Sequence, residues 1–375
     1  MHRLPNRREF VSSTLFGLGA TLCARRTVAA GAPSDAAAVA WYDVREVGLE
    51  GKGWTETEKF YDRLPAKAKK TVRAAVWNLS RHSAGMMARF QTDAAEIWAD
   101  YKVTSSNLAM PHMPATGVSG LDLYARDDAD RWRWLSVVRP TAQAMTTQLV
   151  SGLAVSRRVY AMYLPLYNGT EHLRIGVPKG SSFTLIEPRT EKPIVFYGTS
   201  ITHGACASRA GTPHVAILGR RLDRPTINLG FSGNGRMESA VGDLLAELDA
   251  AVYVIDCLPN MQGGEVAQRA EPLVRQLRKA QPKTPIVLVE DRTYPAAGFR
   301  PSLRQRHLES RKALRAAYDK LRDAGVDRLE YLDGETLLGD DRDDTTDGSH
   351  PSDLGFYRHA EAFEPVLRRA LKAAE

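Results

Sequence analysis

Cysteine is scarce in this chain of 375 residues, which holds only Cys23, Cys206 and Cys257. This count excludes a disulfide-rich scaffold, and it favours Cys206 and Cys257 as buried free thiols over a single disulfide between them. Long apolar runs are also missing: the most apolar stretch near the N-terminus, residues 10–22, is too short and too mild to span a bilayer stably. We therefore expect a mature protein that is folded and not embedded in a membrane.

Positive charge is in small excess, and most of this excess lies near the N-terminus. The formal net charge is +7, and residues 1–30 alone hold five arginines against one glutamate. The rest of the chain is too weakly basic to indicate nucleic-acid binding. Hydrophobic residues make up 43% and charged residues 25%, close to globular averages, which excludes wholesale disorder. The length predicts two or three domains.

The N-terminus has the pattern of a targeting segment. Arg7 and Arg8 precede the apolar run, and small residues gather at 28–32, as at a signal-peptidase site. Residues 1–32 are thus predicted to be a twin-arginine export signal, which implies a periplasmic or secreted protein; the alternative is an ordinary basic, disordered leader. Leu22 stands before Cys23 where a lipoprotein signal would have a small residue, which argues against a lipid anchor.

The mature chain changes character near residue 190. Residues 38–186 contain short alternating runs bounded by turn residues, which predicts an all-β sandwich domain with one helical stretch at 66–79. The strands expected there are 86–90, 96–103, 132–138, 158–164 and 173–177.

Residues 192–375 instead alternate compact apolar runs with amphipathic segments, which predicts a parallel sheet covered by helices on both faces. The expected strands are 194–197, 226–229, 252–258, 286–290 and 329–332. The expected helices are 213–221, 237–247, 266–280, 303–324 and 352 to the C-terminus.

Polar side chains with catalytic potential follow these predicted strands. Ser200 lies on a glycine-flanked turn after the first strand, where open α/β sheets bind ligands. It could be a nucleophile or merely the N-cap of the next helix, and the turn alone does not separate the two. Asp347 and His350 lie three residues apart before the last helix, a spacing that lets the carboxylate orient the imidazole. A capped turn is the structural alternative for this pair.

Two further turns carry hydrogen-bond donors. Gly233 lies in a glycine-rich turn after the second strand, and Asn260 follows the third. A backbone N–H and a side-chain amide are suitable donors to the negative oxygen of an acyl-transfer transition state. Taken separately, both residues are also common in ordinary turns.

The four segments in this order resemble the SGNH (GDSL-type) hydrolase superfamily. Its functional blocks are a serine after the first strand, a glycine, an asparagine and a C-terminal Asp-x-x-His. In this chain Gly-Thr-Ser stands where the family usually has Gly-Asp-Ser, so Thr199 precedes the serine. The replaced aspartate is not a member of the triad.

The resemblance covers residues 192–375 and implies roles for the individual residues. It implies Ser200 as nucleophile, His350 as general base and acid, and Asp347 as the residue that orients His350. It also implies an oxyanion hole formed by the N–H groups of Ser200 and Gly233 with the side chain of Asn260. The implied fold is a flavodoxin-like three-layer α/β/α sandwich with a five-stranded parallel sheet.

A second resemblance concerns the front half. The segment Gly120-Leu121-Asp122-Leu123-Tyr124 is similar to the Gly-x-Asp-Leu-Tyr signature of a β-sandwich domain, jelly-roll-like in type, that precedes the hydrolase in certain bacterial SGNH esterases. This two-domain arrangement implies a carbohydrate esterase that removes acetyl groups. For Asp122 and Tyr124, a turn aspartate and a packed aromatic are favoured over contacts to substrate.

The expected function is an exported serine esterase that hydrolyses O-acyl, chiefly O-acetyl, esters of a carbohydrate. Its expected partner is the acylated carbohydrate, with no nucleic acid, and no protein partner is assigned. No cofactor is expected, and no metal, because none of the nine histidines has a metal-ligating spacing. The alternatives are a lipid or general carboxylesterase and a non-catalytic carbohydrate-binding protein.

Overall fold

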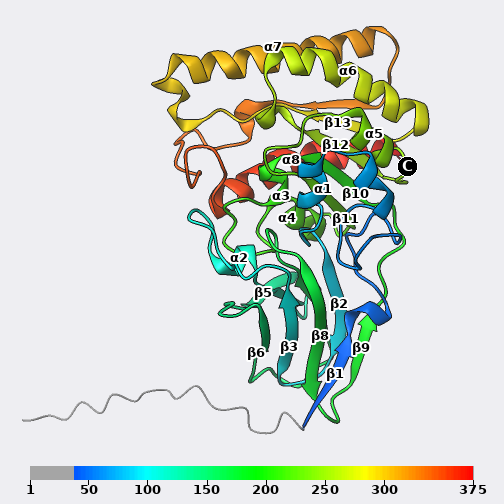
Figure 1. The fold of residues 1–375 in the computed structure, drawn as a ribbon, viewed down its shortest axis with the longest axis vertical. Coiled ribbons are helices and arrows are strands. Elements are labelled where there is room, and N and C mark those ends of the chain that lie inside the picture. Colours follow the sequence, from blue (N-terminus) through cyan, green and yellow to red (C-terminus); the bar gives the residue numbers. More distant parts are fainter. Residues whose placement is uncertain (1–37, 375) are drawn as a thin grey trace, which may run out of the picture. The chain divides into compact units, whose positions relative to one another are not determined.

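Five short and almost wholly buried strands form a parallel sheet in the second half of the chain (Figure 1). The computed structural model describes residues 38–374, so the predicted export signal lies outside the described residues. The strands are β10 (Ile194–Gly198), β11 (Thr226–Gly230), β12 (Val252–Asp256), β13 (Ile286–Val289) and β14 (Leu329–Leu332). Their order in the sheet is β11-β10-β12-β13-β14, the flavodoxin-like order.

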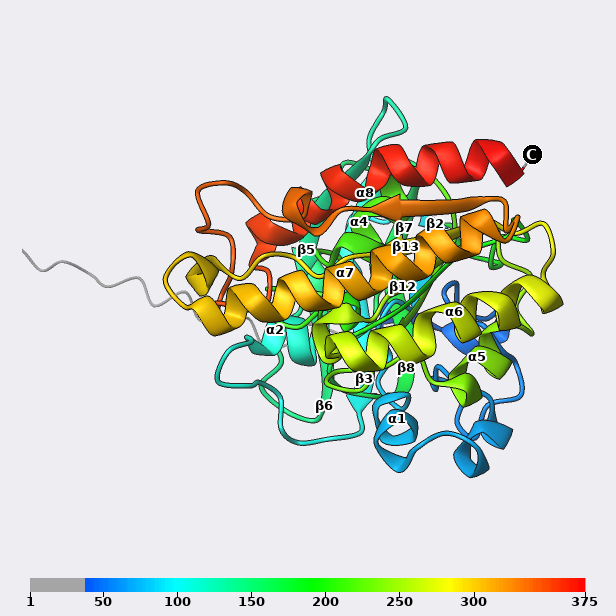
Figure 2. The ribbon, with the colours of Figure 1, turned by 90° about the horizontal axis from the view of Figure 1, so that it is seen from above.

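Helices cover both faces of this sheet. They are α3 (Ser200–His203), α4 (His214–Arg221), α5 (Ser239–Leu245), α6 (Gly263–Ala280), α7 (Pro301–Asp323) and α8 (Asp353–Ala374). Val195 and Tyr197 of β10 pack into the core formed with α5, α6 and α7, whereas Ile194 and Phe196 pack with α4 and α8. Figures 1 and 2 show α6 and α7 side by side on one face. Successive strand residues point to opposite faces, so the central strands are apolar at nearly every position; Asp256 at the end of β12 is the exception among β10, β12 and β13.

Two antiparallel sheets form the sandwich that precedes this α/β part. One has the order β1-β8-β3-β6 and the other β5-β4-β7-β2-β9. The strands are β1 (Val39–Asp43), β2 (Met87–Thr92), β3 (Ile97–Val103), β4 (Asp122–Arg126), β5 (Trp132–Val137), β6 (Ala144–Val150), β7 (Arg158–Tyr163), β8 (Thr170–Pro178) and β9 (Phe183–Ile186). The short helical elements are η2 (Val44–Glu46) and α2 (Ala115–Val118) here, and η4 (Leu258–Asn260), η5 (Pro295–Gly298) and η6 (Gly334–Thr336) in the α/β part. The predicted fold class is confirmed in both halves.

The helical stretch predicted at residues 66–79 is two elements rather than one. A 3₁₀ helix, η3 (Ala66–Lys70), is followed by α1 (Ala74–Leu79), and Arg73 between them has extended backbone with φ −59° and ψ 145°. Arg73 bonds to Glu238 at 2.5 Å and to Asn234 at 2.7 Å, both in the α/β part. These contacts with distant residues stabilise the extended conformation of Arg73, which interrupts the helix between Lys70 and Ala74.

The segment around α1 packs on the α/β part and not inside the sandwich. Trp77 is buried in the same core as Tyr197 of β10. The guanidinium of Arg63, only 2% exposed, donates to the backbone oxygens of Asn228 at 3.0 Å and Gly230 at 2.8 Å, at the carboxyl end of β11. Arg63 also donates to backbone oxygens of its own region, so one buried cation ties the N-terminal half to the edge of the sheet where the predicted site lies.

None of the helices within residues 38–374 combines the length and the hydropathy needed to cross a bilayer.

Candidate active site

Ser200 lies at the first position of α3, directly after β10, and is 7% exposed. Thr199 is the N-cap of this helix: its side-chain oxygen accepts a hydrogen bond from the N–H of Ile201 at 3.3 Å. The capping role that was the alternative for Ser200 therefore belongs to Thr199. Ser200 is left with its hydroxyl free for other partners.

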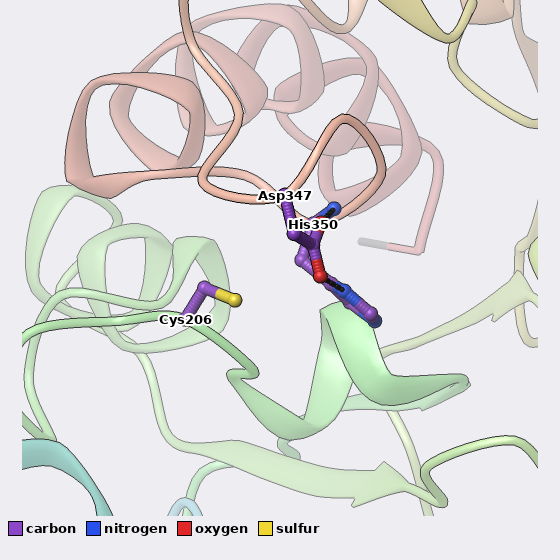
Figure 3. A group of neighbouring side chains, drawn as sticks. All are labelled: Cys206, Asp347 and His350. Carbon is purple, nitrogen blue, oxygen red and sulfur yellow. Dashed lines mark hydrogen bonds and ion pairs between the residues drawn. The ribbon is translucent and has the colours of Figure 1, made fainter. Parts of the chain in front are cut away.

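Ser200, His350 and Asp347 form a continuous hydrogen-bonded line. Ser200 Oγ lies 2.8 Å from His350 Nε2, and His350 Nδ1 lies 2.8 Å from Asp347 Oδ2. Figure 3 shows His350 and Asp347 side by side on the loop before α8. The other oxygen of Asp347 accepts the backbone N–H of His350 at 2.7 Å. Because the carboxylate fixes which imidazole nitrogen carries the proton, Nε2 is available to accept the proton of Ser200.

Hydrogen bonds from His350 stabilise the negative charge of Asp347. Partial burial works against ionisation, but hydrogen bonds from the backbone and side chain of His350 lower the pKa of Asp347 below its ordinary value. The side chains of Asp347 and His350 are 34% and 24% exposed. The Asp347 carboxylate is therefore favoured in its ionised form, and both side chains are partly exposed to solvent.

A buried arginine holds the loop that carries this pair. Arg292, 1% exposed, donates to the backbone oxygen of Ser349 at 3.0 and 2.7 Å and to its hydroxyl at 2.7 Å. Ser349 lies between Asp347 and His350. Arg292 also pairs with the buried Asp291, so this guanidinium links the segment after β13 to the loop of Asp347 and His350.

The three predicted oxyanion donors belong to turns that begin at one edge of the sheet. The backbone pairing of β10 with its neighbours brings Gly230 and Asp256 level with Gly198, so the turns that follow all three strands start at the same edge. Gly233, in one of these turns, has φ +69°, a conformation that favours glycine.

The amide of Asn260 is oriented by one contact. Its oxygen accepts the N–H of Gly235 at 3.2 Å, which leaves the NH₂ group to donate elsewhere. Within the described residues, neither this NH₂ nor the N–H groups of Ser200 and Gly233 have an acceptor. Preorganised, unpaired donors beside a nucleophile can stabilise a developing oxyanion.

Sequence and structure comparisons identify the family of each half of the chain. Residues 191–368 match the model of the GDSL-like lipase/acylhydrolase family, and residues 39–183 match the model of the N-terminal domain of SGNH-type esterases. A putative GDSL-like lipase from Bacteroides ovatus is 32% identical over 89% of this chain and 98% of its own, with a TM-score of 0.85.

This chain belongs to the GDSL-like lipase/acylhydrolase family.

More distant structures share the two-part fold of this SGNH-type acylhydrolase. A salicylyl-acyltransferase from a tetracycline biosynthetic pathway is 18% identical over 90% of this chain and 96% of its own, with a TM-score of 0.69. A family two carbohydrate esterase from Cellvibrio japonicus is 12% identical over 90% and 99%, with a TM-score of 0.59. At these identities the likeness concerns the fold alone. No curated protein matches the chain.

The signature aspartate of the SGNH esterase's front domain is a junction residue. Asp122 begins β4 and is fully buried, so the expected turn position is wrong. Its carboxylate accepts from Gly211 N–H at 2.8 Å, Arg209 Nη1 at 3.0 Å and Trp134 Nε1 at 2.9 Å. Tyr124 is packed, as predicted, with its hydroxyl 3.3 Å from the backbone oxygen of Gly211. The signature thus joins the sandwich to the acylhydrolase part.

Asp256, which sequence reasoning did not single out, lies behind the nucleophile of this esterase. Burial raises the pKa of Asp256 to about 7, and its carboxyl accepts a hydrogen bond from Thr202 Oγ1 at 3.0 Å. Thr202 belongs to α3, the helix that carries Ser200. In the sequence, Asp256 could have been recognised as a site residue only by its position at the end of β12, because ligands of such sheets bind at the carboxyl ends of the strands.

Cys206 and Cys257 are buried free thiols in this acylhydrolase, as predicted. Burial, together with the negative charge of Asp347, raises the pKa of Cys206 to about 11, so this thiol is neutral at ordinary pH and is not a competing nucleophile.

Proposed function

We propose that this acylhydrolase is a serine esterase that removes O-acetyl groups from a carbohydrate, with Ser200 as nucleophile, His350 as general base and acid, and Asp347 as the residue that orients His350. The observation that carries the proposal is the unbroken line from Ser200 Oγ to His350 and Asp347, with both links at 2.8 Å. Nucleophile, base and orienting carboxylate in hydrogen-bond contact are the arrangement that acyl transfer requires.

The reaction follows from this geometry. Ser200 Oγ attacks the carbonyl carbon of the ester while its proton passes to His350 Nε2. The resulting imidazolium is stabilised by the ionised Asp347. His350 then protonates the sugar oxygen as the C–O bond breaks, which leaves an acetyl group on Ser200. Water, deprotonated by His350, hydrolyses that acyl-enzyme by the same route.

The negative oxygen of both tetrahedral intermediates needs fixed donors. We assign this role to the N–H groups of Ser200 and Gly233 and to the NH₂ group of Asn260. Each such donor is worth about 10²–10³ in rate. The mechanism uses only groups of this chain and water.

The carbohydrate substrate is supported by two features. The catalytic pair is partly exposed on a surface loop, which suits an ester carried by a bulky polymer. The shared fold also includes a family two carbohydrate esterase and an acetyl xylan esterase from Butyrivibrio proteoclasticus, whose TM-score is 0.54. Export through the twin-arginine route, proposed from residues 1–32, would bring the enzyme to extracellular or periplasmic polysaccharide.

The test is acetate release from a panel of acetylated polysaccharides and simple acyl esters. The wild-type protein is compared with Ser200→Ala and with Ser302→Ala, a control serine on the exposed face of α7. Acetate release from a polymer that is lost in Ser200→Ala and kept in Ser302→Ala supports the proposal. Turnover of only longer or simple esters replaces it with a lipid or general carboxylesterase. No turnover, with retained binding to polysaccharide, replaces it with a non-catalytic carbohydrate-binding protein.

A further inference from the structure

A third side chain reaches the Asp347–His350 pair. One ligand-type atom each from Cys206, Asp347 and His350 lies within 4.8 Å of the other two (Figure 3). Cys206 comes from the turn after α3, and the other two come from the loop before α8. The sulfur therefore reaches the pair from a distant segment of the chain, a juxtaposition that spacing in the sequence does not reveal.

The backbone holds Cys206 in this place. The residue has φ +71°, a left-handed conformation that a non-glycine residue adopts only when its surroundings impose it. It is 6% exposed, so the sulfur is almost enclosed by the protein. The thiol is thus held in place, while the side chains of Asp347 and His350 lie on a loop and are more exposed.

Sulfur, imidazole nitrogen and carboxylate oxygen are the three ligand types that Zn²⁺ selects. Zinc–ligand distances of about 2.3 Å for sulfur and about 2.0–2.2 Å for nitrogen and oxygen place tetrahedral ligand atoms roughly 3.5 Å apart. His350 Nδ1 and the Asp347 oxygen already lie 2.8 Å apart, so these two atoms separate slightly on binding one ion, whereas the Cys206 sulfur and the pair approach by up to about 1.3 Å. Three ligands leave a fourth position for water, so the site needs no further residue.

We propose that Cys206, Asp347 and His350 form an inhibitory site for Zn²⁺ that switches the esterase off reversibly. The inference rests on the proposed function for its effect on catalysis, but the binding site itself does not. The imidazole nitrogen that would ligate the ion is Nδ1, because it is the one that faces Asp347.

Inhibition follows from the position of one proton. In the active state Nδ1 carries the proton and Nε2 accepts from Ser200. When Zn²⁺ occupies Nδ1, the proton of the neutral ring resides on Nε2, and the thiol proton of Cys206 leaves to solvent. Nε2 then donates to Ser200 and can no longer take its proton. The ion also withdraws Asp347 from the histidine that it orients.

Binding is measured first, by titrating ZnCl₂ into the Ser200→Ala protein in a calorimeter. This variant does not depend on turnover. One Zn²⁺ per chain is expected, weakened at least 10-fold by adding Cys206→Ser and unchanged by adding Cys257→Ala, which removes the other buried thiol. Equal binding with and without Cys206 would overturn the site. Co²⁺ provides a second measurement on the chain with its native cysteines: a thiolate-to-cobalt absorption band is expected, and coordination without that band would also overturn it.

Inhibition is measured next, on the wild-type enzyme with a simple acetyl ester. Micromolar Zn²⁺ is expected to abolish turnover, EDTA to restore it, and Mg²⁺ to have no effect. Cys206→Ser should turn over ester at the wild-type rate without zinc and need at least 10-fold more zinc for inhibition. Equal sensitivity of this variant would refute the proposal. If no ester is turned over at all, the proposed function fails, whereas the calorimetric result still decides the metal site.

Discussion

Removing the carboxylate of Asp122 should loosen the junction between the sandwich and the acylhydrolase part. All three partners of this carboxylate are donors: Gly211 N–H, Arg209 and Trp134. A carboxylate satisfies three donors because it has only acceptors, whereas an amide has one oxygen and one NH₂ group. Asp122→Asn therefore turns at least one attractive contact into a donor–donor contact.

The cost can be worked out from the burial of each partner. Asp122→Ala leaves the buried N–H of Gly211 without an acceptor, a loss of about 1–3 kcal/mol. It also leaves Arg209 without its carboxylate; removal of one partner from a fully buried pair costs about 3–5 kcal/mol, and less here because Arg209 is 24% exposed. We expect a loss of about 4 kcal/mol in the free energy of unfolding for Asp122→Ala and about 2 kcal/mol for Asp122→Asn.

The assay is urea unfolding followed by tryptophan fluorescence at pH 8. Burial raises the pKa of Asp122, so an alkaline buffer keeps the wild-type carboxylate ionised. Asp128→Asn is the matched control, because the side chain of Asp128 is 88% exposed and, within residues 38–374, pairs only with Arg158 at the surface. An Asp122→Ala protein as stable as the control would show that the signature aspartate does not hold the junction.

Three further predictions concern the site. Asn260→Ala should lower kcat about 10²–10³-fold in ester hydrolysis, and an unchanged kcat would remove Asn260 from the oxyanion hole. Arg292→Lys keeps a charge near Asp291 but loses the forked contact to Ser349, so kcat should fall about 10–100-fold with little change in KM; an effect on KM alone would contradict a positioning role. The pKa of Asp256 is raised on folding to about 7 from 3.8, so its stabilisation is fully present below pH 3.8 and is lost as the pH rises through 7. In the wild-type protein, Asp256 should lower the free energy of unfolding by up to about 1.4 kcal/mol per pH unit between pH 4 and 7, and Asp256→Asn should remove this decline. Urea unfolding at several pH values measures it. The same dependence of unfolding free energy on pH in both proteins would refute the raised pKa of Asp256.

The fold of the α/β part could be predicted closely because each of its strands is a compact apolar run covered on both faces. β10 and β12 are buried at every position, and such runs stand out from the amphipathic helices between them. The strands of the sandwich were harder to predict from the sequence. β1, β4, β6 and β9 were not predicted, and β6 has a polar centre, Thr146 to Gln148, with exposed and half-buried positions that give it no buried apolar face there.

The candidate triad could also be predicted, because Ser200 and the Asp347–His350 pair stand in strand-end turns with recognisable spacing. Contacts between distant segments could not. His203, three residues after Ser200, is fully buried, with Nε2 2.7 Å from the backbone oxygen of Leu166 and its ring stacked on Tyr167. Leu166 and Tyr167 belong to the sandwich part, so the sequence around His203 could not predict these contacts.

The contact of Arg63 with the end of β11 has a consequence for engineering. A fragment that begins at residue 192 would expose the backbone oxygens of Asn228 and Gly230 that Arg63 now satisfies, and would strip the cover of Trp77 from the core. We therefore expect the acylhydrolase part to be unstable when it is expressed without the segment from Arg63 to Trp77. A chimaera that exchanges front domains between relatives has to place its crossover so that the segment from Arg63 to Trp77 stays with its own catalytic half.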